Sequence, residues 1–317
     1  MTERVLIIDG TNIFYRAYVV NPSLSTDGRP VGGLVGFLKT LQKLIREMKP
    51  TKVFICWDGA GGSPHRRSIV ASYKAGRKAI RLNRSDGVHM SLEDENKSKL
   101  EQMLRLLDYI DNLPVVQLIH DGVEADDMIS IICREIKGAQ KIIVSSDKDF
   151  YQLLDDETIL YRPIQVKFYT KKTLIEEYGI HPNNFALARA VAGDKSDNLP
   201  GVAGAGLKTI AKRFPFLLEE RDYSITDLVD CCEEVENPLK VHTGIVEDYD
   251  KILKNYKIMQ LYVPSVSFQV RAIVKNSVEN YPKYYNKTEV VKMMIKDGFP
   301  EINWNDLFVS SNRIASS

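Results

Sequence analysis

Three short apolar segments that end in aspartate constrain the fold of this chain most strongly. They read RVLIIDG ending at Asp9, KVFICWDG reaching Asp58, and KIIVSSDKD reaching Asp147 and Asp149. Their β-branched, apolar composition predicts buried strands. Segments with apolar residues at helical spacing separate them, from Leu34 to Met48 and from Met128 to Ile136. This alternation predicts an α/β fold with a mostly parallel central sheet flanked by helices.

The strand ends are expected to gather acidic residues at one edge of the sheet. A fourth strand is predicted around Val115 to Ile119, and a hairpin between Thr158 and Thr170. In open parallel sheets, ligands bind beyond the carboxyl ends of the strands. The aspartates that end the strands, and the acidic cluster that follows Ile119, should therefore lie near one another.

Composition narrows the class of protein. With 317 residues and 44% hydrophobic content, the chain can form one large domain or two unequal ones. No apolar run approaches the ~20 residues of a membrane span, and the start MTER lacks the apolar core of a secretory signal. We therefore expect a cytoplasmic protein, in the host cytoplasm if its source is viral. Four cysteines without CxxC spacing indicate neither a zinc site nor a disulfide framework.

The segment EADD places three carboxylates, Glu124, Asp126 and Asp127, just before an apolar run. Capping of a helix would use one or two of them. A third carboxylate costs electrostatic repulsion unless water or a cation neutralises it. The later segment GDKSDN adds Asp194 and Asp197, although Asp197 could simply start a turn.

Nine acids are predicted at the same rim of the sheet: Asp9, Asp58, Glu124, Asp126, Asp127, Asp147, Asp149, Asp194 and Asp197. Nine carboxylates cannot all ionise in one cleft unaided, and a site without His or Cys suits magnesium or manganese. Two such ions about 4 Å apart can activate water and stabilise the leaving oxygen in phosphodiester cleavage. Hydrolysis of nucleic acid is the leading hypothesis, and for any single acid a role as cap or surface residue is an equal alternative.

A basic stretch supports a nucleic-acid partner. Residues 63–85 contain seven Lys or Arg and no acid, in a chain whose net charge is +1. In a helix, Lys74 and Arg77 would share one face and could meet one scissile phosphate. Further DNA-binding candidates are Tyr15, Arg16, Arg66, Tyr73, Arg81 and Arg84, the tyrosines by base stacking. A solvated basic face is the alternative.

A glycine-rich turn after Pro200 predicts a second nucleic-acid contact. GVAGAG, with Gly201, Gly204 and Gly206, leads into a basic helix with Lys208 and Lys212. Two helices joined by a glycine hairpin can bind a phosphate backbone through free N–H groups without reading bases.

Seven ordered motifs resemble the 5′ nucleases of the flap-endonuclease superfamily, especially stand-alone bacteriophage enzymes and the 5′ nuclease domain of bacterial DNA polymerase I. The motifs are LIIDGTNIFYRAY, GGLVGFLKTL, VFICWDG, YKAGR, GVEADDMIS, SSDKDFYQLL and GDKSDNLPGVAGAG. The resemblance implies a PIN-like core with a helical arch, at about residues 79–96, that shapes passage of the 5′ strand. It assigns Lys74 and Arg77 to stabilisation of the attacked phosphate and the glycine hairpin to duplex binding, in some members with K⁺.

The resemblance also divides the acids between two metal sites. Residues matching Asp9, Asp58, Glu124, Asp126 and Asp127 serve the first site, and those matching Asp147, Asp149, Asp194 and Asp197 complete the second, some through water. The expected cofactors are two Mg²⁺, with Mn²⁺ as a substitute. The chain departs from the family in SPHRRSIVAS, where many members carry an acid after the first arginine, and at Ala205, where a larger apolar residue is common.

We therefore expect a structure-specific 5′ nuclease that acts at 5′ flaps, nicks or RNA primers in DNA replication or repair. Residues 1–180 should form the nuclease domain, 181–262 a helix-hairpin-helix type DNA-binding module, and 263–317 a segment packed on the body. Within this last segment, VSFQVRAIV is expected to be strand-like. The remaining ~100 residues are too few for a polymerase domain, so a stand-alone enzyme is expected. A single-strand-binding protein or another replication protein is left open as a partner.

Two alternatives are kept. A PIN-type single-strand ribonuclease would lack GDKSDNLPGVAGAG and the arch. A catalytically silent DNA-junction-binding protein would need the basic stretch and the hairpin but not the acids. Retention of every acidic motif favours the nuclease.

Overall fold

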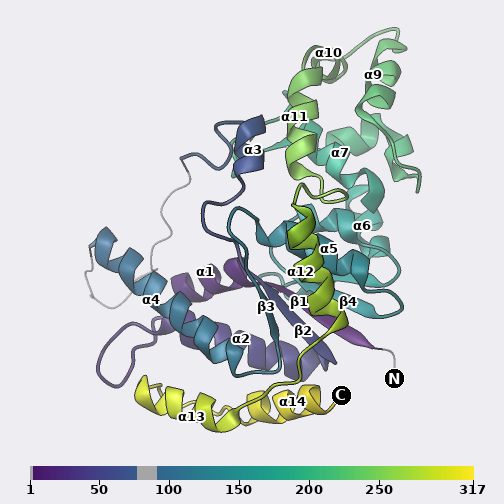
Figure 1. The fold of residues 1–317 in the computed structure, drawn as a ribbon. Helices are drawn as coiled ribbons and strands as arrows, with labels where there is room; N and C mark the ends of the chain where they lie inside the picture. The colour runs from purple at the N-terminus through teal and green to yellow at the C-terminus, as the bar shows by residue number, and fades with distance from the viewer. Residues whose placement is uncertain (1–2, 77–90) are drawn as a thin grey trace.

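The computed structural model describes residues 3–76 and 91–317 (Figure 1). These residues form a six-stranded sheet. Its strands are β1 (Arg4–Asp9), β2 (Lys52–Cys56), β3 (Val116–Leu118), β4 (Gln140–Val144), β5 (Thr158–Arg162) and β6 (Lys167–Tyr169). The spatial order is β3-β2-β1-β4-β5-β6, and only the β5–β6 pair is antiparallel. The α/β class and the mostly parallel sheet are confirmed.

Strand β1 lies at the centre because its side chains are apolar on both faces. Val5 and Ile7 belong to the core on one face of the sheet, and Leu6 and Ile8 to the core on the other. Successive side chains of a strand point to opposite faces, so a run without polar residues suits a strand that is covered on both sides. Parallel pairing aligns Asp9 with Cys56 of β2 and Ile8 with Val144 of β4. The carboxyl ends of these three strands consequently lie side by side.

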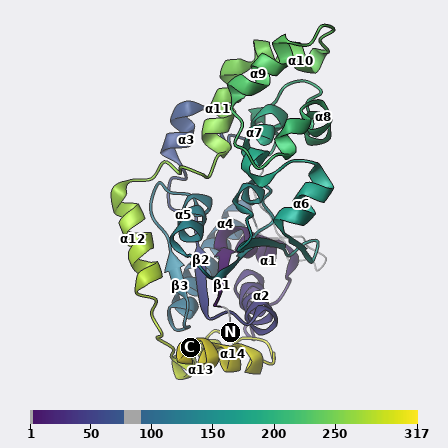
Figure 2. The same cartoon turned by 90° about the vertical axis from the view of Figure 1, so that its right-hand side faces the viewer.

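Helices of the N-terminal half and the C-terminal end cover one face of the sheet (Figures 1 and 2). They are α1 (Gly10–Val20), α2 (Gly32–Met48), α4 (Leu92–Asp111), α13 (Lys287–Lys296) and α14 (Asn305–Ser316). Helix α14 packs on α2, where Arg46 Nη1 forms an ion pair with Asp306 at 2.9 Å and Leu307 N donates to Gln42 Oε1 at 3.1 Å. The C-terminal helix therefore covers α2 on this face.

The other face and the upper part of Figure 1 carry the remaining helices. They are α3 (Pro64–Ile69), α5 (Ala125–Glu135), α6 (Lys171–Tyr178), α7 (Pro182–Ala192), α8 (Leu207–Arg213), α9 (Ile225–Glu233), α10 (Lys240–Glu247), α11 (Tyr249–Met259) and α12 (Phe268–Glu279), with short 3₁₀ turns η1 (Asp149–Leu153) and η2 (Pro215–Leu218). A two-residue pair, β7 (Gly193–Asp194) with β8 (Leu199–Pro200), precedes the glycine turn. One apolar cluster runs from β1 through α5 and α7 to α12.

The segment VSFQVRAIV is helical from Phe268 onward, so the expectation of strand-like structure there is wrong. Ser267 accepts a hydrogen bond from Val270 N and begins α12, and Val270 and Val274 are buried four positions apart. That spacing places both valines on one helical face, against the apolar cluster. Within the ranges that the structure describes, none of the helices has the length and apolarity to cross a membrane.

Candidate active site

The ends of β1, β2 and β4 bring Asp9 and Asp58 together. Asp9 begins α1, and its Oδ2 accepts a hydrogen bond from Ser145 Oγ at 2.8 Å, just past the end of β4. Asp58 Oδ1 accepts from Ala125 N at 2.8 Å, the first residue of α5. Asp58 N in turn donates to Thr11 Oγ1 at 2.9 Å. Each carboxylate is thus held by a group from a neighbouring strand or helix.

The EADD acids surround a buried arginine. Arg66 from α3 is 4% exposed, and its guanidinium contacts Glu124, Asp126 and Asp127. Its Nη2 lies 3.0 Å from Asp127 Oδ1 and its Nη1 3.0 Å from Asp126 Oδ1. The donors of Arg66 already serve three carboxylates away from solvent, and its expected role in DNA binding stays a prediction.

A second arginine pairs the remaining acids. Arg189 of α7 donates from Nε to Asp149 Oδ1 at 2.9 Å and also bonds Asp194. Asp194 additionally accepts from Ser196 N and Ser196 Oγ. Our reading of the sequence missed Arg189. The signal was present, since a single cation interrupts the apolar run FALARAVA.

Burial raises the pKa of several of these carboxyl groups. Burial, followed by the charge of Asp58, raises the pKa of Asp9 to about 8. Burial and a neighbouring acid raise the pKa of Asp127 and of Asp149 to about 7. For Glu124, burial acts in the same direction, but the nearby arginine and lysine charges outweigh it and lower the pKa. The negative charge of these carboxyl groups is therefore only partly balanced by the nearby arginine and lysine side chains.

All nine predicted acids are electrostatically connected. Asp9 interacts with Asp58 and Asp147, and Asp58 with Glu124 and Asp126, which also interact with Asp127. Asp147 interacts with Asp126, Asp149 and Asp197, and Asp149 with Asp194. Among the described residues, the cations that pair with them are Arg66, Lys74 and Arg189. The structure thus gathers the nine acids at one edge of the sheet.

The chemistry of this set fits hard divalent cations. The donors are oxygen only, they are largely buried, and they repel one another. As the side chains stand, no three His, Cys, Asp or Glu residues in 3–76 and 91–317 are grouped so as to hold a metal ion. Many of the carboxylate oxygens accept hydrogen bonds from backbone amides and the two arginines instead. Metal binding would require some carboxylates to turn away from these donors.

Lys74 lies beside the EADD acids, but on a turn. Residues 71–76 form a turn rather than the expected helix, and Lys74 has a left-handed φ of 57°. Its Nζ lies 2.7 Å from Glu124 Oε2. Tyr73 is 5% exposed and its hydroxyl donates to Glu124 Oε2 at 3.1 Å, and its expected role in base stacking stays a prediction. Lys74 is therefore not part of a helix, and Arg77 lies outside the described residues.

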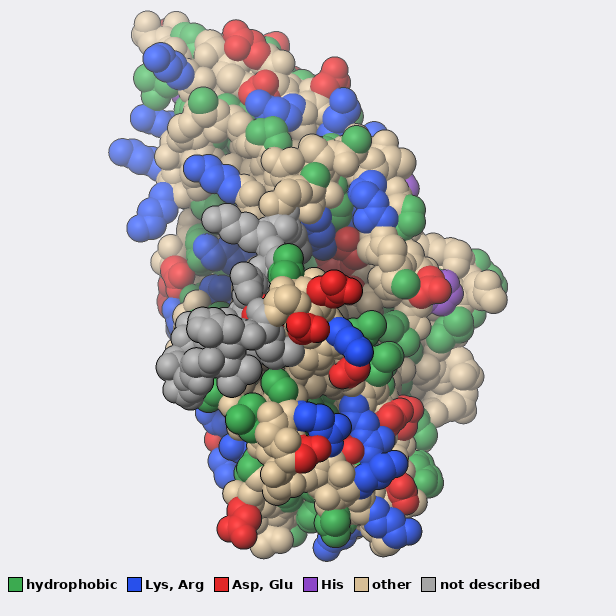
Figure 3. All heavy atoms as spheres, turned by 90° about the vertical axis from the view of Figure 1, so that its left-hand side faces the viewer, with side chains coloured by type: hydrophobic (Ala, Val, Ile, Leu, Met, Phe, Trp, Pro, Cys, Tyr) green, Lys and Arg blue, Asp and Glu red, His purple; other side chains and the backbone are tan. Residues whose placement is uncertain are grey.

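The other basic and aromatic candidates are distributed unevenly. Tyr15 and Arg16 are half-buried on α1, past Asp9. Arg77, Arg81, Arg84 and the expected arch up to residue 90 lie outside the described residues. Residues 91–96 begin α4, where Ser91 accepts from Asp94 N. Figure 3 shows Lys and Arg side chains on the upper part of one face, above a recess where acidic and basic side chains meet.

The glycine turn connects α7 to α8. Gly204 has a φ of 77°, and no described atom beyond its chain neighbours lies within 4 Å of a Cβ built there or at Gly206. Lys208 and Lys212 are exposed on α8. Gly201 differs, because an added Cβ would lie 2.1 Å from Ala192 O. Gly204 and Gly206 are thus open to a ligand, whereas Gly201 serves close packing.

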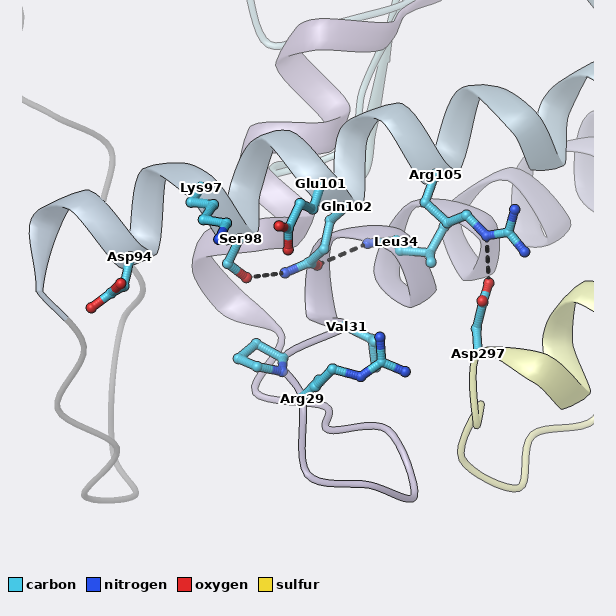
Figure 4. Close-up of a pocket in the computed structure, with 11 residues that line it drawn as sticks. Arg29, Val31, Leu34, Asp94, Lys97, Ser98, Glu101, Gln102, Arg105 and Asp297 are labelled. Atoms are coloured by element: carbon cyan, nitrogen blue, oxygen red, sulfur yellow. Dashed lines mark hydrogen bonds and ion pairs between the residues drawn. The ribbon is translucent and has the colours of Figure 1, made fainter.

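A pocket of about 420 Å³ lies away from this edge, between the loop before α2 and helix α4 (Figure 4). Gln102 Oε1 accepts from Gly33 N at 2.8 Å, and Arg105 Nε pairs with Asp297 Oδ2 at 2.7 Å. Acidic and basic residues alternate along its wall, and its lining includes none of the nine acids. We assign it no chemistry.

Comparison with known proteins identifies relatives. Residues 4–179 match the family model described as 5′-3′ exonuclease, N-terminal resolvase-like domain. DNA polymerase I of Bacillus subtilis is 32% identical over 267 residues, 81% of this chain but 28% of the polymerase. The 5′-3′ exonuclease of Aquifex aeolicus is 31% identical over 210 residues, 65% of this chain and 67% of that protein. The chain thus spans only about a quarter of the polymerase relatives that it matches.

Solved structures share the fold. The T5 5′-exonuclease with bound zinc ions has a TM-score of 0.70 and 18% identity, covering 88% of this chain and 99% of that one. The bacteriophage T5 flap endonuclease in a pseudo-enzyme-product complex with DNA and metal ions has a TM-score of 0.69 at the same identity and coverage. Together with the family match and the identity to the polymerase, this shows that the chain belongs to the 5′-3′ exonuclease family, a family of nucleases.

Proposed function

We propose that this protein is a divalent-metal-dependent 5′ nuclease that hydrolyses phosphodiester bonds at 5′ flaps, nicks or RNA primers in DNA replication or repair. The observation that carries the proposal is the set of nine carboxylates from strand ends and the hairpin loop at one edge of the sheet, with Lys74 beside them. The names of the relatives, a 5′-3′ exonuclease and a flap endonuclease with DNA and metal ions, support it.

Two groups of acids would hold two Mg²⁺ ions, with Mn²⁺ as a substitute. The first group consists of Asp9, Asp58 and the EADD acids. The second group consists of Asp147, Asp149, Asp194 and Asp197. When bound, such ions activate a water and stabilise the leaving oxygen of a phosphodiester. The carboxylates of Asp9 and Asp58 would hold the ions in place. Both are already fixed by hydrogen bonds at strand ends and helix starts before any ligand binds.

Lys74 would offset charge on the attacked phosphate, together with Arg77. Its side chain is 28% exposed, so its amine can pair with Glu124 and still face a ligand. A well-placed electrostatic group of this kind contributes about 10²–10³-fold to the rate. The buried Tyr73 hydroxyl shares the same carboxylate oxygen and so steadies Glu124 next to the lysine.

The glycine hairpin would hold the duplex. Gly204 and Gly206 leave room for a phosphate backbone, and Lys208 and Lys212 add positive charge on the following helix. K⁺ at this hairpin is part of the proposal. The division into a nuclease domain (1–180), a DNA-binding module (181–262) and a C-terminal segment (263–317) is also proposed, as is a replication protein partner.

The test is cleavage of end-labelled 5′-flap, nicked and RNA–DNA hybrid substrates with magnesium, mapping the first cut. Asp58→Asn and Asp147→Asn should abolish cleavage while DNA binding persists, because each removes a carboxylate at the centre of the acidic set. Asp121→Asn, an exposed acid of the same loop as EADD, is the matched control. Undiminished cleavage by both variants would overturn the proposal, and cleavage confined to single-stranded RNA would favour the PIN-type ribonuclease.

A further inference from the structure

The turn that carries Lys74 is joined to the loop that precedes the glycine hairpin. Lys74 N donates to Asp197 O at 2.9 Å, and Asn198 Nδ2 donates to Ser72 O at 3.1 Å. The same Ser72 oxygen accepts from Ala75 N at 2.9 Å, which closes the turn itself. Two hydrogen bonds therefore connect segments that lie far apart in the sequence.

Both residues at this junction have left-handed backbones. Lys74 has a φ of 57° and Asn198 a φ of 59°. Asparagine adopts this conformation several times more readily than most residues, whereas lysine does so only when its surroundings hold it there. The bonds from Asn198 and to Asp197 are thus well placed to keep Lys74 in a conformation it would not adopt alone.

A small apolar cluster lies beneath these bonds. Tyr73 packs with Leu199, Ile258 and Met259, and Ile69 and Val70 lie against them. This cluster is separate from the two large cores of the sheet. It places the Lys74 turn against both α11 and the hairpin loop, so a displacement of the loop would be transmitted to the turn.

We propose that Asn198 is a positioning residue for Lys74, and that it couples the duplex-binding hairpin to the catalytic lysine. The inference rests on the proposed role of Lys74 in the nuclease reaction. Asn198 acts through the Ser72 carbonyl and needs no contact with the substrate. Without this amide the turn loses its hydrogen bond to Asn198 and can relax. The lysine amine, which lies 2.7 Å from Glu124 Oε2, then moves away from its position beside the acids.

The variant Asn198→Gly tests this cleanly, because glycine keeps the left-handed backbone and removes only the amide. Lys49→Gly is the matched control, since Lys49 is another left-handed residue (φ 48°) at the end of α2, outside the site. We expect Asn198→Gly to slow single-turnover cleavage of a 5′-flap duplex about fivefold, the worth of one hydrogen bond, with an unchanged DNA dissociation constant. In a Lys74→Ala background the same change should have no further effect.

Hydrogen exchange of the Lys74 amide provides a readout that is independent of activity. That N–H donates to Asp197 O, so its exchange should become faster in Asn198→Gly and stay unchanged in Lys49→Gly. Equal rate losses with and without Lys74, or a slower rate explained by weaker DNA binding, would overturn the positioning role. If the wild-type protein cleaved no substrate while the exchange changed as expected, the junction would stand and the nuclease proposal would fail.

Discussion

Replacing Arg66 with methionine should destabilise the metal-free protein far more than any change at its neighbours on α3. Arg66 is 4% exposed and pairs with Glu124, Asp126 and Asp127. Removing one partner of a buried ion pair typically costs about 3–5 kcal/mol of unfolding free energy, because the other charge is left buried and unpaired. Methionine retains much of the packed volume, so the loss of unfolding free energy comes chiefly from removal of the positive charge.

The structure places the expected loss at the lower end of that range. Glu124 keeps Tyr73 and Lys74 as partners, and the side chain of Asp126 is 25% exposed and can be hydrated. Asp127 is the acid left buried, and its pKa, already raised to about 7 by burial and Asp126, lets it take up a proton. We therefore expect a loss of about 3 kcal/mol for Arg66→Met near neutral pH.

Urea unfolding with a chelator present measures this loss, and Arg67→Met is the matched control. Arg67 is the exposed neighbour on the same helix, and a change there should stay within about 0.5 kcal/mol. Magnesium should reduce the difference between the two variants, because bound cations would neutralise the same carboxylates. Equal stability of the two variants in the chelator would refute the account of Arg66 as the counter-charge of the acidic set.

Four further outcomes follow from the structure. The pKa of Asp9 is raised to about 8, above its unfolded value of about 4, so ionisation lowers stability as pH rises between these values. Magnesium should consequently raise the melting temperature more near pH 8.5 than near pH 6, and an equal rise would contradict this. Gly201→Ala should lose about 2 kcal/mol in urea unfolding, because its Cβ would meet Ala192 O at 2.1 Å. Gly206→Ala should keep full stability, with no described atom within 4 Å of its Cβ, but weaken duplex binding in a titration. Arg189→Met should lower the melting temperature of the metal-free protein by several degrees, since it leaves Asp149 and Asp194 without their shared cation; an unchanged value would show the pair to be dispensable.

Local patterns determined the sheet and the identity of its acids. Apolar, β-branched runs and their terminal aspartates predicted β1, β2 and β4 and placed Asp9 and Asp58 at one edge, because parallel pairing brings carboxyl ends together. The antiparallel hairpin of β5 and β6 was likewise predicted. In contrast, VSFQVRAIV was read as strand-like although α12 begins at Phe268, because short apolar runs suit either state until packing decides between them.

The sequence by itself determined which acidic side chains are candidates for the site, and the tertiary structure decided how they are paired. The spacing of apolar residues and the ends of strands are local properties, so they can be read from the sequence alone. The position of Arg66 among the EADD acids, of Arg189 between Asp149 and Asp194, and of the left-handed Lys74 turn depends on contacts between distant segments. Such pairings depend on burial, since a cation and a carboxylate attract strongly only once the fold has removed both from water.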